Sequence, residues 1–244
     1  METASPEQIK EINEYGRDII EFLKLDTSPV AVTLLPKGAE VPGNIRKIDK
    51  AMRHCQMIDR VRKTKEEFYA THEDESCKGG AGVLGLRKMP PKVASGEFYY
   101  ETLKHFGSLE AAKRTIDKVP VIEAESKSAI IYAPLETSSF MPDIVVIICS
   151  PKQVMLLTQA FLYKKGGRVE TEFAGKQSLC SDAVAQPYTT GKIGITLGCS
   201  GSRNYTFIQE SELTVGIPIR LLKDIVEGMR KIVETAPAHG TKKD

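Results

Sequence analysis

The sequence predicts an α/β protein in which two similar halves surround a mixed sheet, with flanking helices at the N- and C-terminal ends. Continuous runs of β-branched and aliphatic residues at 30–35 and 143–149 are typical of strands that are buried on both faces. Ser5 and Ser150 each precede a proline and are followed three residues later by glutamine, which is the signature of a capped helix start. Strands and amphipathic helices therefore alternate along the chain.

A repeated order of elements indicates an internal duplication. Each half contains a buried strand and, further along, a helix with one cysteine, a strand, and a turn with another cysteine. We therefore expect a single domain over residues 1–244 that contains two structural repeats, at about residues 25–100 and 128–217. Two halves packed around a pseudo-twofold axis would bring four thiols to a shared centre.

The first half begins with an amphipathic helix. Ser5 caps this helix and apolar residues recur behind it at helical spacing, so we expect it to occupy residues 5–24. The other elements expected in this half are a strand at 30–35, a helix at 50–62 with Cys55, a strand at 67–71 and a turn at 77–80 with Cys77.

The second half is expected to follow a linking helix and strand and to end in a long helix. Pro218 opens that final helix, whose apolar side should close the core, and we expect the tail at 239–244 to be frayed. The elements before it are a helix at 99–118, strands at 128–135 and 143–149, a helix at 150–164, a strand at 169–173, a helix at 178–186 with Cys180, and a strand at 191–197 that leads to a turn with Cys199.

Composition narrows the class of protein. The 244 residues are 41% hydrophobic and 27% charged, which is typical of a globular protein, and the formal net charge is only +2. A nucleic-acid partner is not expected, because the broad basic field that such a partner requires is missing. We find no secretory signal and no apolar run near the ~20 residues of a membrane span, so we expect a cytoplasmic protein with no membrane partner.

Four of the five cysteines form the candidate site. Reduced cytosol disfavours disulfides, so widely spaced cysteines are expected to be metal ligands, catalytic thiols or core residues. Cys149 ends a strand of aliphatic residues, and we interpret it as a small buried hydrophobe. The predicted ligands are Cys55, Cys77, Cys180 and Cys199.

The spacing of these cysteines favours an iron–sulfur cluster over zinc. Structural zinc sites usually take paired ligands from a short knuckle with two to four residues between cysteines, and the chain has no such pair. A [4Fe–4S] cluster can be held by four separate segments, because each thiolate binds a different iron. Zinc remains the alternative cofactor, and metal-free or purely structural thiols remain open as well.

Residues beside the cysteines are candidates for binding the cofactor. Small residues let backbone amides approach a sulfur closely. An arginine beside the site could compensate the thiolate charge or hold an anionic substrate, and a surface ion pair explains the arginine equally well. These candidates are Gly79, Gly80, Gly201 and Arg203. His54 is expected to be a half-buried helix residue that points away from the Cys55 site, since helix neighbours diverge by about 100°. His72 is a candidate replacement ligand or solvated loop residue.

Several short motifs together resemble a known family. They are Cys77-Lys-Gly-Gly with the following Leu84-Gly-Leu86, Tyr-Ala-Pro-Leu at 132–135, Pro-Asp-Ile-Val at 142–145, Gln153 with Met155, and Cys199-Ser-Gly-Ser-Arg203. The chain resembles the archaeal and bacterial family called domain of unknown function 169 over nearly its whole length. The resemblance implies a cytosolic protein of anaerobe-rich lineages and implies no activity.

The function expected from these residues is redox work by an iron–sulfur protein, as electron transfer or as cluster-assisted chemistry on a small molecule. If only three cysteines held the cluster, its open iron could bind substrate as a Lewis acid. The alternatives are a metal-free enzyme with Cys77 or Cys199 as nucleophile, and a zinc-binding scaffold or metal carrier. The partner would be a redox protein or a small-molecule substrate, and homo-oligomer formation is left open.

Overall fold

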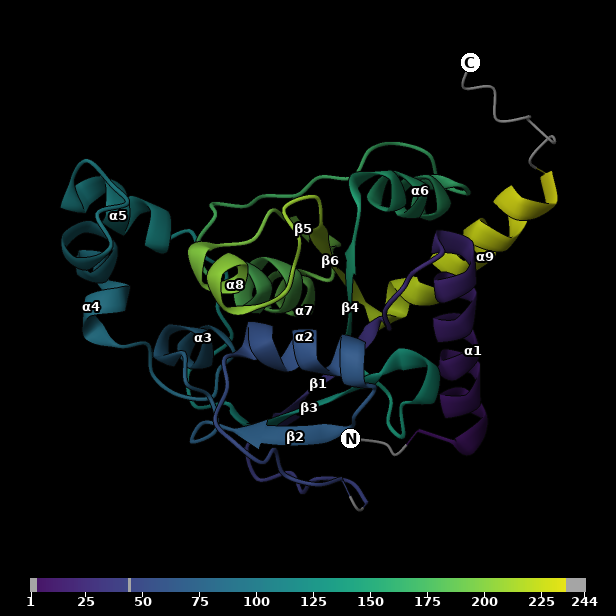
Figure 1. Ribbon diagram of the computed structural model, residues 1–244, viewed down its shortest axis with the longest axis horizontal. Coiled ribbons are helices and arrows are strands. Elements are labelled where there is room, and N and C mark those ends of the chain that lie inside the picture. Colours follow the sequence, from purple (N-terminus) through teal and green to yellow (C-terminus); the bar gives the residue numbers. More distant parts are fainter. Residues whose placement is uncertain (1–3, 44, 236–244) are drawn as a thin grey trace.

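A central sheet with helices on both faces forms the protein (Figure 1). The structure is a computed structural model that describes residues 4–43 and 45–235, so the predicted tail at 239–244 lies outside the described residues, as do the two ends of the 1–244 domain. In the described part of the chain the sheet has six strands in the order β2-β3-β1-β4-β6-β5. They are β1 (Val30–Pro36), β2 (Phe68–Thr71), β3 (Lys127–Pro134), β4 (Ile144–Cys149), β5 (Gly194–Thr196) and β6 (Leu213–Pro218).

The α/β class predicted from the sequence is confirmed, together with the helices at both ends. The ladders between these six strands are antiparallel, and the parallel pairings are isolated bridges at Lys47–Tyr69 and Met52–Glu75. The strand order is symmetric, because β1 and β4 pair at the centre and each is followed outward by a long strand and then a short edge strand. An internal duplication would give this order, and the two repeats stay a prediction.

Most helices agree with the predicted positions. Ser5 and Ser150 both form complete capping boxes, with Gln8 and Gln153 as their partners. The α-helices are α1 (Pro6–Leu23), α2 (His54–Thr64), α3 (Lys78–Val83), α4 (Pro91–Ala94), α5 (Leu109–Ile116), α6 (Pro151–Leu162), α7 (Gln186–Thr190), α8 (Ser200–Tyr205) and α9 (Ile219–Thr235). Two π-helical segments, η1 (Phe98–Thr102) and η3 (Ser178–Ala185), and a short 3-10 turn, η2 (Leu135–Thr137), complete the helical segments of the described residues.

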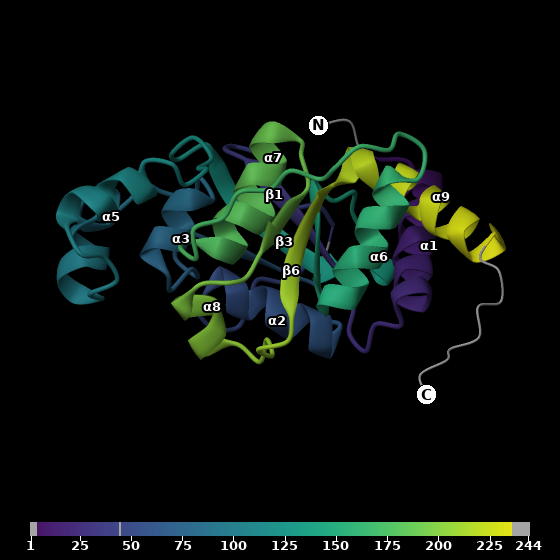
Figure 2. The ribbon, with the colours of Figure 1, turned by 90° about the horizontal axis from the view of Figure 1, so that it is seen from above.

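Two hydrophobic layers lie on opposite faces of the sheet. In the ribbon of Figure 2, α1, α6 and α9 lie on one side of the strands and α3 and α8 on the other. Side chains alternate along a strand, so Ala31 and Leu35 of β1 join the layer of α1, α6 and α9, whereas Val32 and Leu34 join the layer of α2, α3 and η3. Both faces of β1 are buried, as the unbroken apolar run predicts. The candidate site belongs to the layer of α2, α3 and η3.

Several predicted elements are wrong or displaced. The strand predicted at 169–173 is irregular, because its contact with β5 is made by the Thr171 hydroxyl, which accepts from Ile195 N at 3.0 Å, rather than by a backbone ladder. The helix predicted at 99–118 is interrupted between η1 and α5, where Ser108 caps a new helix start. Strand β6 was not predicted.

The turns predicted at Cys77 and Cys199 are helix starts instead. Cys77 is the N-cap of α3, and Cys199 is the N-cap of α8. The glycine-rich residues 79–83 are helical because they are buried against the core, so tertiary packing overrides their low helix propensity. Helix α2 begins at His54, later than the predicted residue 50, and still carries Cys55 in its first turn.

A small lobe projects at one end of the molecule, where Figure 1 shows α4 and α5 beyond α3. It has its own apolar cluster of Val93, Tyr99, Ala112 and Ile116. In the part of the chain that the structure covers, no helix combines the length and the apolarity that a membrane span requires.

Candidate functional site

Four cysteines from four separate elements line one small cavity. Cys55 comes from α2, Cys77 precedes α3, Cys180 lies in η3 and Cys199 precedes α8. The volume of the cavity is about 40 Å³. The cysteines that the sequence grouped as candidate ligands are therefore brought together by the fold.

Two of the thiols that line the cavity, those of Cys77 and Cys180, lie close to the same glycine. A Cβ atom on Gly80 would lie 3.5 Å from Cys77 Sγ and 3.9 Å from Cys180 Sγ, so these two sulfurs share one neighbouring backbone position. Within the described ranges, no three His, Cys, Asp or Glu side chains are arranged to hold a single metal ion.

Cys149 lies on the other side of the sheet. It is buried with the residues that pack under α1, α6 and α9, whereas Cys180 belongs to the opposite layer. The sheet separates the Cys149 thiol from the cavity, in agreement with its interpretation as a buried hydrophobe.

Hydrogen bonds hold the two cysteine-bearing segments of each half together. In the first half, Met52 N donates to Asp74 O and Ser76 N donates to Met52 O, both at 2.9 Å, which fixes the segments before Cys55 and Cys77 side by side. In the second half, the Thr196 hydroxyl of β5 donates to the Asp182 carboxylate of η3 at 2.7 Å. The backbone around each pair of thiols is thus preorganised.

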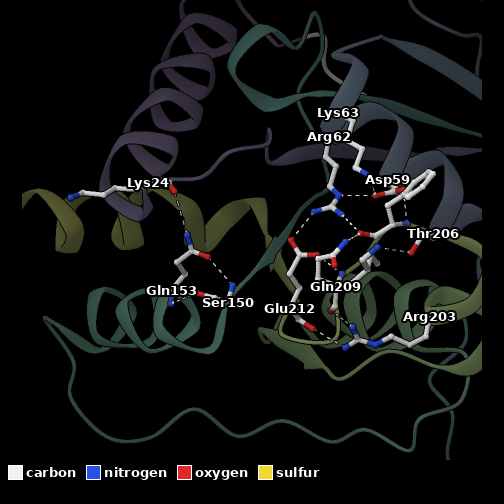
Figure 3. A network of polar contacts seen from close by, with 12 residues as sticks. Lys24, Asp59, Arg62, Lys63, Ser150, Gln153, Arg203, Thr206, Gln209 and Glu212 are labelled. Carbon is white, nitrogen blue, oxygen red and sulfur yellow. Dashed lines mark hydrogen bonds and ion pairs between the residues drawn. The ribbon is translucent and has the colours of Figure 1, made fainter.

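A buried ionic network connects the two halves (Figure 3). Arg62 of α2 donates to Asp59 Oδ1 at 2.8 Å and to Glu212 Oε1 at 3.0 Å, and Asp59 Oδ2 accepts from Phe207 N at 3.0 Å. Arg62 and Asp59 are only 3% and 5% exposed. The network fixes the helix of Cys55 against the loop that follows α8, which Cys199 caps.

Three of the thiols are held in the neutral form by burial. Burial raises the pKa of Cys55 to about 12, raises the pKa of Cys77, and raises that of Cys180 well above its ordinary value. The Cys180 thiol donates to Gln177, whose Oε1 lies 3.2 Å from the sulfur. A metal that bound here would have to displace these protons.

Cys199 differs from the other three thiols. Burial opposes its ionisation, but hydrogen bonds from the side chains and backbone N–H groups of Ser178 and Ser202 outweigh that effect and lower its pKa. Cys77 receives a comparable donor, since Gly80 N lies 3.3 Å from its sulfur. These donors are of the kind that stabilise thiolates.

Polar residues that sequence reasoning missed surround the thiols. Glu75 is 6% exposed and accepts from Cys77 N at 2.9 Å, and burial raises the pKa of its carboxyl to about 8. Gln177 donates from Nε2 to the Tyr99 hydroxyl at 2.6 Å while it contacts Cys180. Glu75 lies two residues before Cys77 and Gln177 three residues before Cys180, but neither forms a motif that would mark it in the sequence.

His54 is more buried than expected. It is 2% exposed rather than half-buried, its Nδ1 lies 2.7 Å from the Tyr132 hydroxyl, and it lines the cavity together with Cys55. The expectation that His54 points away from the site is therefore wrong, since the cavity extends past both helix neighbours. Burial lowers the pKa of His54 to about 3, so the imidazole is neutral. His72, by contrast, is exposed and lines a separate depression.

The guanidinium at the cavity belongs to Arg53. It lines the cavity, lies 4.0 Å from the centre of the Tyr205 ring, and acts to lower the pKa of Cys55, Cys77 and Glu75. Arg203, which the sequence indicated, instead donates to the carbonyls of Leu197, Gln209 and Glu212 and so braces the loop around α8 (Figure 3).

The three candidate glycines allow close approach rather than turning. None has a positive φ, because all three lie in α3 or α8. A Cβ on Gly201 would lie 3.6 Å from Cys199 Sγ, and one on Gly79 would lie 2.6 Å from Gln177 Nε2. Gly80 and Gly201 line the cavity itself.

A larger cleft of about 520 Å³ adjoins the cavity. Its walls come from the small lobe, from α3 and α8, and from residues 175–177. Cys77 and Cys199 line both the cleft and the cavity, whereas Cys55 and Cys180 line only the inner cavity. Two of the four thiols are therefore reached from the cleft.

Comparisons with known proteins identify relatives of the chain. The family model described as DUF169, an uncharacterised ArCR family, matches residues 18–228. An uncharacterized protein of Methanocaldococcus jannaschii is 42% identical over 222 residues, which are 91% of this chain and 94% of the relative. No solved structure matches the chain.

Proposed function

Because the chain belongs to the family of domain of unknown function 169, we infer its function from the cavity itself, and propose that it binds an iron–sulfur cluster for redox chemistry. Cys55, Cys77, Cys180 and Cys199 would be the ligands of a [4Fe–4S] cluster. The observation that carries the proposal is that four cysteines from four elements line one cavity, while the fifth lies across the sheet.

The distribution of the four cysteines supports a cluster more than a single ion. They come from four separate elements around a cavity of about 40 Å³. Four thiolates on one zinc ion would all lie about 2.3 Å from a single point, whereas thiolates on a cubane cluster bind different irons and surround a volume. A set of cysteines spread over four segments suits the cluster.

One polar side chain beside the cavity suits an occupant. The Gln177 side-chain amide can hydrogen-bond Cys180 both as a thiol and as a metal-bound thiolate. Its oxygen accepts from the thiol, and a flip of the amide would present its nitrogen as a donor to the thiolate.

The position of the cleft suits a cluster that exchanges electrons or acts on a small molecule. A cluster held by these four cysteines would face the cleft through Cys77 and Cys199. We propose that a redox protein or a small molecule meets it there, in the cytoplasm.

Iron analysis tests the cluster directly. We expect anaerobically purified protein to be brown, to absorb broadly near about 400 nm and to contain close to four irons, as a cubane cluster requires. Colourless, iron-free protein would contradict the proposal, and stoichiometric zinc would replace it with a structural zinc site.

Paired cysteine variants test the ligand assignment. Cys199→Ala should lose the absorbance and most of the iron, whereas Cys149→Ala should retain both, because Cys149 lies on the opposite face of the sheet. Iron and absorbance are measured on anaerobic samples of both variants, with circular dichroism to check that each is folded. Retention of a full cluster by Cys199→Ala would refute the assignment.

A metal-free thiol enzyme is the second candidate, with Cys199 as nucleophile. Cys199 lines the cleft, and hydrogen bonds from Ser178 and Ser202 lower its pKa despite burial. In iron-free protein, iodoacetamide should modify Cys199 faster than Cys55 or Cys180, because the lowered pKa of Cys199 gives it more thiolate at a given pH than the raised pKa values of the other two allow. Peptide mass spectrometry measures the order, and equal rates for the three thiols would remove this candidate.

A further inference from the structure

The cleft beside the thiols is strongly basic. Four cationic side chains line it, from α3, α4 and the segments before α2 and η3, and they are Arg53, Lys78, Lys92 and Lys176. Among the described residues of its lining, none is acidic. No ion pair joins any of the four to a carboxylate in the described part of the chain, so their charge is available to a ligand.

The same cleft presents apolar and aromatic surface. Phe98 and Tyr99 of the small lobe form one wall, and Tyr205 of α8 contributes to the other. Tyr205 is 54% exposed and its ring lies against the Arg53 guanidinium at 4.0 Å, which leaves a cationic group next to a flat apolar one. A volume of about 520 Å³ lies within the usual range of roughly 300–1,000 Å³ for small-molecule sites.

We propose that this cleft binds a small organic anion, a carboxylate or phosphate carried on an apolar body, beside Cys77 and Cys199. The cations hold the anionic group, and the aromatic walls pack against the rest of the molecule. The identification of this anion as the substrate rests on the proposed function, whereas its binding does not. Gln177 connects the two sites, since it contacts both Tyr99 in the cleft wall and Cys180 in the cavity.

Calorimetric titration of the purified protein with three matched probes tests the binding. Phenyl phosphate and benzoate carry the two anionic groups on one ring, and benzyl alcohol is their neutral counterpart. We expect at least one anion to bind about tenfold more tightly than benzyl alcohol and to weaken as salt is raised. The anion that binds more tightly, phenyl phosphate or benzoate, shows whether the site prefers a phosphate or a carboxylate. Equal binding of the neutral probe would overturn the proposal.

Charge-neutral variants locate the site. Lys92→Gln combined with Lys176→Gln should lower the affinity for the more tightly bound anion about tenfold, because two charge-assisted contacts are lost. Lys10→Gln, an exposed position on α1 that removes one positive charge outside the cleft, should leave the affinity unchanged. Unchanged affinity in the double variant would overturn the proposal.

Iron content of the same samples separates this inference from the proposed function. If iron-free protein binds the anion, the proposed anion site is supported and the proposed cluster is contradicted. If the protein carries its full iron but binds no anion, the cluster is supported and the anion site is contradicted.

Discussion

Replacing Arg62 with leucine should lower the free energy of unfolding by about 3–5 kcal/mol, which is the usual effect of removing one partner of a buried ion pair. The Arg62 side chain is 3% exposed, and its loss leaves the Asp59 carboxylate buried without its strongest donor. The loop at Phe207 and Glu212 also loses its anchor on α2. Urea unfolding of wild-type and variant samples with equal iron content measures the difference.

A surface pair provides the matched control. Arg46 pairs with Glu66 at 3.1 Å, but the two side chains are 63% and 31% exposed, so Arg46→Leu should cost less than about 1 kcal/mol. Adding Asp59→Leu to Arg62→Leu should recover part of the loss, because no charge is then left buried alone. Equal destabilisation by Arg46→Leu and Arg62→Leu would mean that the Arg62 network does not hold the two halves together.

Local signals account for the elements that the sequence predicted well. The capping boxes at Ser5 and Ser150 involve residues within four positions of each other. The unbroken apolar run at 30–35 indicates a single strand that is buried on both faces. The cysteine grouping also followed from local order, since each half repeats the same succession of strand, helix and cysteine. Interactions of this range are visible in a single sequence.

Long-range packing explains what the sequence did not predict. Arg53 and Glu75 each lie two residues before a cysteine but carry no motif that marks them, and the bridge between Met52 and Glu75 brings the two segments together. The irregular segment at Thr171 has strand-like composition but bonds through a hydroxyl. Strand β6 was not predicted because Gly216 interrupts its apolar pattern. The glycine is needed there because η3 packs against this position.

Replacing Gly216 with alanine should therefore destabilise the protein by about 3 kcal/mol and disturb the candidate site. A Cβ at this position would lie 1.9 Å from the carbonyl oxygen of Ala183, a backbone atom of η3 that cannot rotate away. Its cross-strand partner Gly194 meets the Asp182 carbonyl oxygen in the same way, at 1.8 Å. The glycine pair thus lets η3, and with it Cys180, lie directly on β5 and β6.

The coupling between this packing and the site is what the variant measures. If Cys180 is a cluster ligand, Gly216→Ala should lower the iron content as well as the free energy of unfolding. The added Cβ clashes with a backbone atom, so η3 itself has to move away from the sheet.

Gly107→Ala is the matched control. Nothing described lies within 4 Å of a Cβ at this position and its φ is not positive, so iron content and stability should both stay near wild type. Unchanged stability of Gly216→Ala would contradict the seating of η3 on the sheet. Reduced stability with full iron content would instead show that the position of η3 does not control the ligand, and would remove Cys180 from the proposed set.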